Sequence, residues 1–134
     1  MADLTITAAN VLAEAFATQV DGVAGETITQ GMPLFLHTDD ELYKADDTTA
    51  LRAACVGIAL NGASNGQPIK YLSDGGYNPG ATVAIGTTYG ITDTAGGIGP
   101  ISDRGSGDFI TILGTATTTS RIELAISASG VAKP

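Results

Sequence analysis

Few side chains in this sequence are of the types that perform catalysis, and they do not fall into a catalytic pattern. His37 is the single histidine, and the single cysteine, Cys55, opens an apolar stretch. A nucleophile needs a base beside it, and no serine or cysteine stands at a spacing from His37 that would define one. We therefore interpret His37 as a surface residue near the end of a strand and Cys55 as a small buried residue.

Carboxylates are more numerous, but their spacing is typical of turns. The densest acidic stretch comprises Asp39-Asp40-Glu41 and Asp46-Asp47. A calcium-binding loop requires carboxylates at alternating positions together with a glycine, and this stretch lacks that order. Asp103 and Asp108 flank a Gly-Ser-Gly sequence, as residues that close a turn do. No Cys/His set has zinc spacing, so the sequence predicts no metal site and no cofactor.

The remaining motif is the glycine-rich Gly96-Gly97-Ile98-Gly99-Pro100. A phosphate-binding loop continues through Lys and Ser or Thr into a helix, whereas this stretch continues through Pro and Ile. The hydroxyl-rich run 115–120 is better interpreted as a turn between the last two strands. The sequence therefore predicts a protein that is not an enzyme and that has no catalytic residues.

Size and charge exclude further classes of protein. The chain has 134 residues, a net charge of −8 and 15% charged residues, and its length suits a single domain. The six basic residues are dispersed, and the acidic excess would repel a polyanion, so we expect no nucleic acid partner. No apolar run approaches the 18 residues of a membrane span, and no basic region followed by an apolar stretch opens the chain. We therefore expect neither a membrane partner nor a secretory signal.

The elements that must position these residues are mainly strands. The chain contains 18 threonines, 12 isoleucines and 18 glycines, and β-branched residues favour a pleated surface while frequent glycines favour turns. Residues 48–54 could form one short helix, and the alanine-rich residues 8–17 could be a helical turn or extended. Alternation of apolar and polar residues predicts strands at 4–7, 32–37, 41–44, 55–60, 67–72, 81–85, 88–91, 109–113 and 121–126.

An internal repeat organises these strands. Residues 25–76 align with 80–130, so that Gly25 to Gly31 lies over Gly80 to Gly86 and Val56 to Ala59 lies over Leu113 to Ala116. We predict an all-β protein, a small β-sandwich or barrel-like fold built from two similar units of about 50 residues with at most one short helix. The predicted boundaries are an extended N-terminal arm at 1–24, a single β domain at 25–127 and a C-terminal tail at 128–134.

Four blocks in order carry a resemblance to a known family: residues 2–7, residues 27–36, residues 56–61 with 66–68, and residues 97–100 leading to 107–114. Together they resemble the capsid-cement, or head-decoration, proteins of tailed bacteriophages, and the resemblance covers nearly the whole chain. It implies a protein that binds the outer surface of the expanded head and stabilises it by bridging subunits of the major capsid protein. It also implies a homotrimer on the capsid, made in the host cytoplasm and located on the outside of the virion.

The family supplies no catalytic residues, but it implies that the N-terminal arm contacts the capsid. An arm of low charge in which Leu4 and Ile6 alternate with threonines can add as a strand to an exposed sheet edge. A charge of −8 suits an exterior position. The residues expected at the capsid contact are Ala2, Asp3, Leu4, Thr5, Ile6, Thr7, Val11, Leu12 and Phe16.

Three other functions stay open at this point. A head fibre or a tail or baseplate module would be found at one vertex or at the tail rather than across the shell. A glycan-binding module would need clustered exposed aromatic residues, and the four tyrosines are scattered in the sequence. A small trimeric β-enzyme such as a nucleotide hydrolase would need a set of metal-binding carboxylates, which the sequence does not show.

Overall fold

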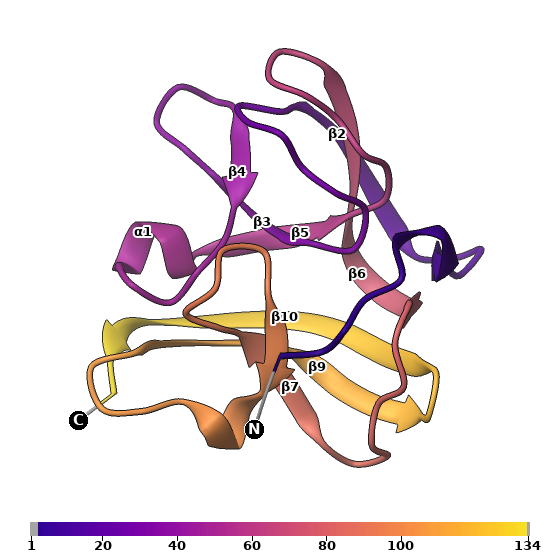
Figure 1. The fold of residues 1–134 in the computed structure, drawn as a ribbon, viewed down its shortest axis with the longest axis vertical. Helices are drawn as coiled ribbons and strands as arrows, with labels where there is room; N and C mark the ends of the chain where they lie inside the picture. Colours follow the sequence, from indigo (N-terminus) through magenta and orange to yellow (C-terminus); the bar gives the residue numbers. More distant parts are fainter. Residues whose placement is uncertain (1–2, 134) are drawn as a thin grey trace.

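The computed structural model describes residues 3–133, and within this range it is an all-β protein with one short α-helix (Figure 1). The predicted fold class is therefore confirmed. The helix α1 (Ala50–Ala53) lies inside the range where the sequence allowed one, and the Thr49 side chain caps it by accepting a hydrogen bond from the backbone N–H of Arg52. The strands are β1 (Val11–Ala13), β2 (Thr18–Val23), β3 (Pro33–Leu36), β4 (Leu42–Lys44), β5 (Cys55–Ala59), β6 (Pro68–Pro79), β7 (Thr88–Ile91), β8 (Ile98–Pro100), β9 (Phe109–Thr118) and β10 (Arg121–Ala132).

The strands form one sheet that curls into a half-barrel. Its path runs β4-β3-β5-β6-β10-β9-β7-β8, with β1 and β2 paired to β6 away from this path. In the first half, β3 pairs with β4 and β5, and β5 pairs with β6. In the second half, β7 pairs with β8 and β9, and β9 pairs with β10. The same element order therefore occurs twice, and the long strand β6 extends from one half into the other (Figure 1).

The backbone hydrogen bonds of the two halves match as well. Each half contains a glycine in the left-handed region, with φ of 96° at Gly31 and 82° at Gly86. In each half, the N–H of this glycine donates to the carbonyl of an alanine, and the N–H of that alanine donates to the carbonyl of the residue after the glycine. The two sets are Gly31–Ala59 and Ala59–Met32 at 2.8 and 2.9 Å, and Gly86–Ala116 and Ala116–Thr87 at 2.8 and 3.0 Å. These residues occupy equivalent positions in the sequence alignment of 25–76 with 80–130.

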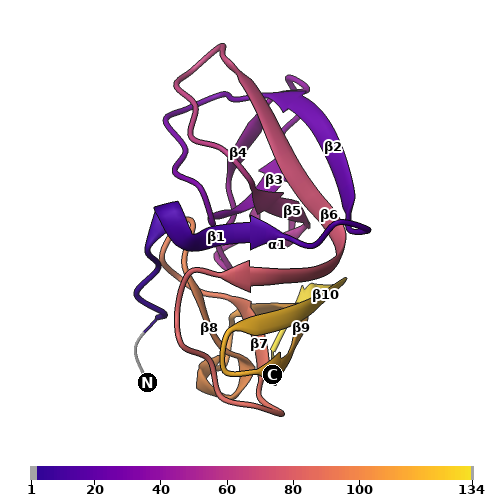
Figure 2. The ribbon, with the colours of Figure 1, turned by 90° about the vertical axis from the view of Figure 1, so that its right-hand side faces the viewer.

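The N-terminal segment, which is the described part of the arm predicted at 1–24, packs along the β domain in this structure. Strands β1 and β2 pair with β6 in continuous order and form the outer edge of the sheet, as Figure 2 shows. Two further backbone contacts fix the ends of the segment: the N–H of Leu4 donates to the carbonyl of Ile98 at 2.7 Å, and that of Gly25 donates to the carbonyl of Leu42 at 2.8 Å. One segment therefore contacts the outermost strand of each half.

Several predicted boundaries change. Residues 4–7 and 81–85 were expected in strands, but they are extended chain and loop. The strand predicted at 67–72 continues through residues 73–79 as β6, because Gly75 and Gly76 leave space for the N-terminal segment to lie against the strand. Part of the expected C-terminal tail, through Ala132, continues β10, while Pro134 lies outside the described residues.

The core follows the alternation of the strands. In β10, Ile122 and Leu124 are fully buried, while Arg121 and Glu123 face outward. Arg104 and Asp47 form a buried ion pair. Arg104 Nη1 lies 3.1 Å from Asp47 Oδ2, and both side chains are almost inaccessible to solvent. No helix among residues 3–133 is long and apolar enough to span a membrane.

Candidate functional site

The residues expected at the capsid contact differ in their exposure to solvent. Thr5, Thr7, Leu12 and Phe16 are exposed, and Leu12 and Phe16 reach exposed fractions of 71% and 101%. Val11 is 3% exposed and belongs to the core. The half-buried residues are Asp3, Leu4 and Ile6, and Ala2 lies outside the described residues. The segment therefore presents some of the expected side chains and uses the others to hold itself to the domain.

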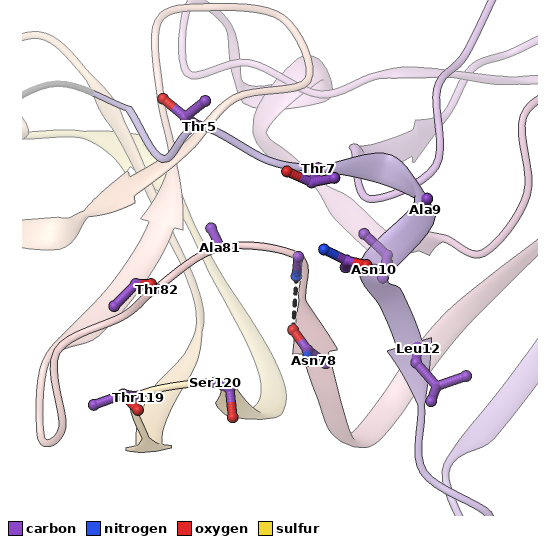
Figure 3. A pocket seen from close by; sticks show the side chains of 12 residues that line it. Thr5, Thr7, Ala9, Asn10, Leu12, Asn78, Ala81, Thr82, Thr119 and Ser120 are labelled. Atoms are coloured by element: carbon purple, nitrogen blue, oxygen red, sulfur yellow. Dashed lines mark hydrogen bonds between the residues drawn. The ribbon is translucent and has the colours of Figure 1, made fainter.

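The exposed part of the segment forms one wall of an open groove of about 700 Å³. In Figure 3, Thr5, Thr7 and Asn10 lie on one side, Ala81 and Thr82 lie on the other, and Thr119 and Ser120 of the β9–β10 turn complete the lining. We call this site the N-terminal groove. Thr82, Thr119 and Ser120 were not expected at the site, because their proximity to the segment arises only from the fold.

A backbone constraint fixes the two walls of the N-terminal groove to each other. The N–H of Thr7 donates to the carbonyl of Gly80 at 2.8 Å. Asn78 Oδ1 accepts from the N–H of Gly80 at 2.9 Å, which is the dashed line in Figure 3. Gly80 has a φ of 75°, and a Cβ there would lie 2.5 Å from the carbonyl oxygen of Thr7. Glycine is needed at this position both for the left-handed backbone and for the close approach.

The lining of the N-terminal groove is polar but uncharged. Its polar side chains are hydroxyls and amides, which both donate and accept hydrogen bonds, and no carboxylate, ammonium or guanidinium group is among its lining residues within the described range. Such a lining can hydrogen-bond the main chain or the polar side chains of an uncharged segment. It contains no group suited to acid–base chemistry near neutral pH.

A second hollow adjoins the first, and the two share Leu12, Asn78 and Ser120 in their linings. This cleft of about 510 Å³ is lined by residues 12–15, by Tyr77 and Asn78 of β6, and by Thr118, Ser120 and Arg121. We call it the turn cleft, because the turn at residues 14–17 forms its rim. Phe16 belongs to this turn but does not enter the cleft, since its side chain is fully exposed.

A charged contact fixes the turn. Arg121 donates to both oxygens of Glu14, from Nε at 2.7 Å and from Nη2 at 2.8 Å, and Nη2 also donates to Glu123 at 2.9 Å. This bidentate contact lowers the pKa of Glu14 and raises that of Arg121. Both partners lie across Gly76, where a Cβ would come within 2.1 Å of Arg121 Nη2. The charges beside the turn cleft are therefore paired with each other.

The residues that the sequence singled out for chemistry lie elsewhere. His37 packs against Phe35 and Tyr43, and Tyr43 donates a hydrogen bond to Asp39 that raises the pKa of the phenol to about 12. Cys55 is buried, and its burial raises the pKa of the thiol to about 12. Among the described residues, no group of three or more His, Cys, Asp and Glu side chains could hold a metal ion.

The glycine-rich motif has a structural role. A Cβ at Gly97 would lie 2.5 Å from Asp3 Oδ2, and a Cβ at Gly99 would lie 3.5 Å from Asp3 Oδ1. Asp3 also accepts a hydrogen bond from Thr92 Oγ1 at 3.0 Å. Gly97, directly before β8, and Gly99, within it, therefore provide the close surface on which Asp3 lies.

No protein-family model matches this chain, and the search of curated proteins finds no match. Sequence comparison thus shows no family for the chain.

Proposed function

We propose that this protein is a bacteriophage capsid decoration protein that binds the outer surface of the expanded head and stabilises it by bridging subunits of the major capsid protein. The resemblance of the sequence blocks to capsid-cement proteins motivates the proposal. The protein acts as a homotrimer on the capsid and carries out no catalysis there. Each bound trimer engages several capsid subunits, so that contacts which are weak one by one become durable together.

The observation that carries this proposal is the N-terminal groove. It is formed by the segment that the resemblance assigns to the capsid contact, and its hydroxyl and amide groups suit an uncharged segment of a protein partner. Because Thr7 is tied to Gly80, the groove exists before binding, which reduces the entropy lost when a partner enters.

The distribution of charge supports the same face. Among the described residues, carboxylates gather at the β3–β4 turn, at Asp39, Asp40 and Glu41, and around Arg104, at Asp3, Asp93 and Asp108. The N-terminal groove has no charged lining residue within the described range. An acidic protein can approach another protein most closely where its own surface is neutral, since like charges elsewhere repel.

The test is binding of the purified protein to undecorated expanded capsids. Thr119→Glu places a charge in the N-terminal groove, and Ser106→Glu places the same charge in the exposed turn before β9, outside the groove. We expect the Thr119 variant to lose most of its occupancy and the Ser106 variant to bind like wild type, as judged by imaging and by co-sedimentation. Equal binding by both variants, or no binding by wild type, would contradict the proposal.

Point variants are preferable to deletion of the segment. Removing residues 2–20 would take away β1 and half of β2 and uncover the edge of β6. The shortened chain would lose capsid binding whether or not the N-terminal groove contacts the capsid.

A further inference from the structure

Phe16 is the most exposed large apolar side chain of the described residues, and the structure holds it outward. Its exposed fraction is 101%, and Leu12, four residues earlier, is 71% exposed. Single apolar side chains on a surface are ordinary, but two large ones beside an open cleft are typical of a protein–protein contact. The question is which partner covers them.

The turn that carries Phe16 is fixed at both ends on β6. On one side the Arg121–Glu14 contact lies across Gly76, and on the other side Ala17 packs on Gly75, where a Cβ would come within 2.8 Å of it. Ala17 also donates its N–H to the carbonyl of Glu14 at 3.1 Å. Two adjacent glycines and an arginine therefore fix the backbone that carries Phe16, which reduces the backbone entropy that is lost when it binds.

The chain also contains a receptor for such a side chain. The turn cleft lies beside Phe16, is lined by apolar surface of Leu12, Ala13 and Ala15, and is not filled by the protein's own Phe16. A patch that carries both an anchor and an empty cleft satisfies the requirement for association of identical chains, in which each copy contributes both parts.

Charge favours a second copy as well. Two molecules with a net charge of −8 repel each other over most of their surface. The charged residues lining the turn cleft, Glu14 and Arg121, are paired with each other. This is the face where two acidic copies can meet.

We infer that the protein self-associates by inserting Phe16 of one copy into the turn cleft of the next. The inference deepens the proposed function and rests on it, because it names the contact between copies within the homotrimer. It assigns Phe16, which the sequence resemblance placed at the capsid contact, to the contact between copies instead. Arg121 is then a positioning residue that holds the turn.

The experiment exploits the lack of tryptophan in the chain. Phe16→Trp introduces a single fluorophore at the proposed contact, and Ile85→Trp introduces one at an exposed position in the loop after β6 as a matched control. We expect the emission of the Phe16→Trp variant to shift to shorter wavelength as the protein concentration rises, in step with the mass measured by sedimentation. The Ile85→Trp variant should keep a solvent-exposed spectrum at every concentration. Wild type that stays monomeric, or emission of the Phe16→Trp variant that is independent of concentration, would overturn the inference.

Two further variants test the two parts separately. Phe16→Asp removes the anchor, and Thr118→Arg obstructs the turn cleft from the end of β9. Each is expected to weaken self-association at least about 30-fold, as loss of a central interface residue does. Ile85→Asp, with the same added charge elsewhere, is expected to leave self-association unchanged, and a loss equal to that of Phe16→Asp would contradict the inference. All of these measurements are made without capsids, so their failure leaves the Thr119 test of capsid binding intact, and the reverse also holds.

Discussion

One polar side chain in the core, Tyr77, contains a group that lowers the stability of the folded protein. The hydroxyl of Tyr77 is fully buried, and within the described residues it has no hydrogen-bond partner. A buried donor without a partner loses its hydration without gaining a contact, so it destabilises the folded state. The ring itself belongs to the larger core cluster and is needed there.

Tyr77→Phe should therefore stabilise the protein. We expect a gain of about 1 kcal/mol in the free energy of unfolding, measured by urea denaturation. Tyr71→Phe, which removes a hydroxyl from a half-buried ring in the same strand, serves as the control and should change the free energy little. Destabilisation by Tyr77→Phe would show that the hydroxyl is bound in the folded protein.

Cys55 predicts a dependence of stability on high pH. Burial raises the pKa of its thiol to about 12, whereas the thiol of the unfolded chain ionises near its ordinary value. Since the folded pKa is the higher one, the unfolded state loses its proton first. The contribution of Cys55 to stability is therefore constant below about pH 8.5 and declines as the pH rises toward 12.

We expect the free energy of unfolding of wild type to decline more steeply above about pH 8.5 than that of Cys55→Ala. The folded protein should also resist thiol reagents at about pH 9, because burial keeps the Cys55 thiol protonated and away from the reagent. Fast modification of the folded protein would contradict the burial of this side chain.

At the scale of strands, the two halves share a tight crossing that glycine makes possible. A Cβ at Gly57 would lie 2.3 Å from the carbonyl oxygen of Leu72, and a Cβ at Gly114 would lie 2.0 Å from that of Glu123. Both clashes involve the backbone of the adjacent strand, which cannot move without breaking its ladder. These two glycines occupy equivalent positions in the two aligned units.

Gly57→Ala and Gly114→Ala should each destabilise the protein by about 1–3 kcal/mol, as overpacking does. Gly105→Ala is the matched control, because its new methyl group would meet only Asp108 Oδ2 at 3.7 Å. The midpoint of thermal unfolding is compared among the three variants. An unchanged midpoint for Gly114→Ala would mean that β9 and β10 can move apart without loss of stability, which would contradict the prediction.

The sequence predicted elements wherever the signal was local. Alternation in 121–126 located β10, and the short helix allowed at 48–54 contains α1, because side-chain periodicity and helix capping depend on near neighbours. It did not predict that β6 passes through Gly75 and Gly76, since the reason lies in Glu14 and Arg121, which are distant in sequence. The exposed residues of the N-terminal segment were expected at the site, whereas Thr82 and Thr119 join it only through the fold.

At the scale of the whole molecule, the Asp47–Arg104 pair connects the two halves. Asp47 also donates its N–H to the carbonyl of Thr92 and accepts from the N–H of Phe109. Burial raises the pKa of this carboxyl, and the hydrogen bond from Arg104 opposes the rise. A charge in this position is costly unless its partner is present.

Arg104→Met should leave Asp47 buried without its partner and destabilise the protein by about 3–5 kcal/mol. The double variant with Asp47→Leu should recover much of this loss, since two apolar residues can replace a buried pair. Lys70→Met breaks the exposed pair with Asp21 and should cost less than about 1 kcal/mol. If Arg104→Met had no larger effect than Lys70→Met, measured by chemical denaturation, the two halves would not depend on this pair.

The docking of the N-terminal segment also bears on how the chain is synthesised. Asp3 accepts a hydrogen bond from Thr92, 89 residues later in the chain, and Leu4 donates one to Ile98. During translation these early residues leave the ribosome long before either partner exists, and contacts of such separation form slowly. Residues 3 and 4 therefore emerge well before they can reach their native place, and until then β8, on which Leu4 docks, is open to other nascent chains.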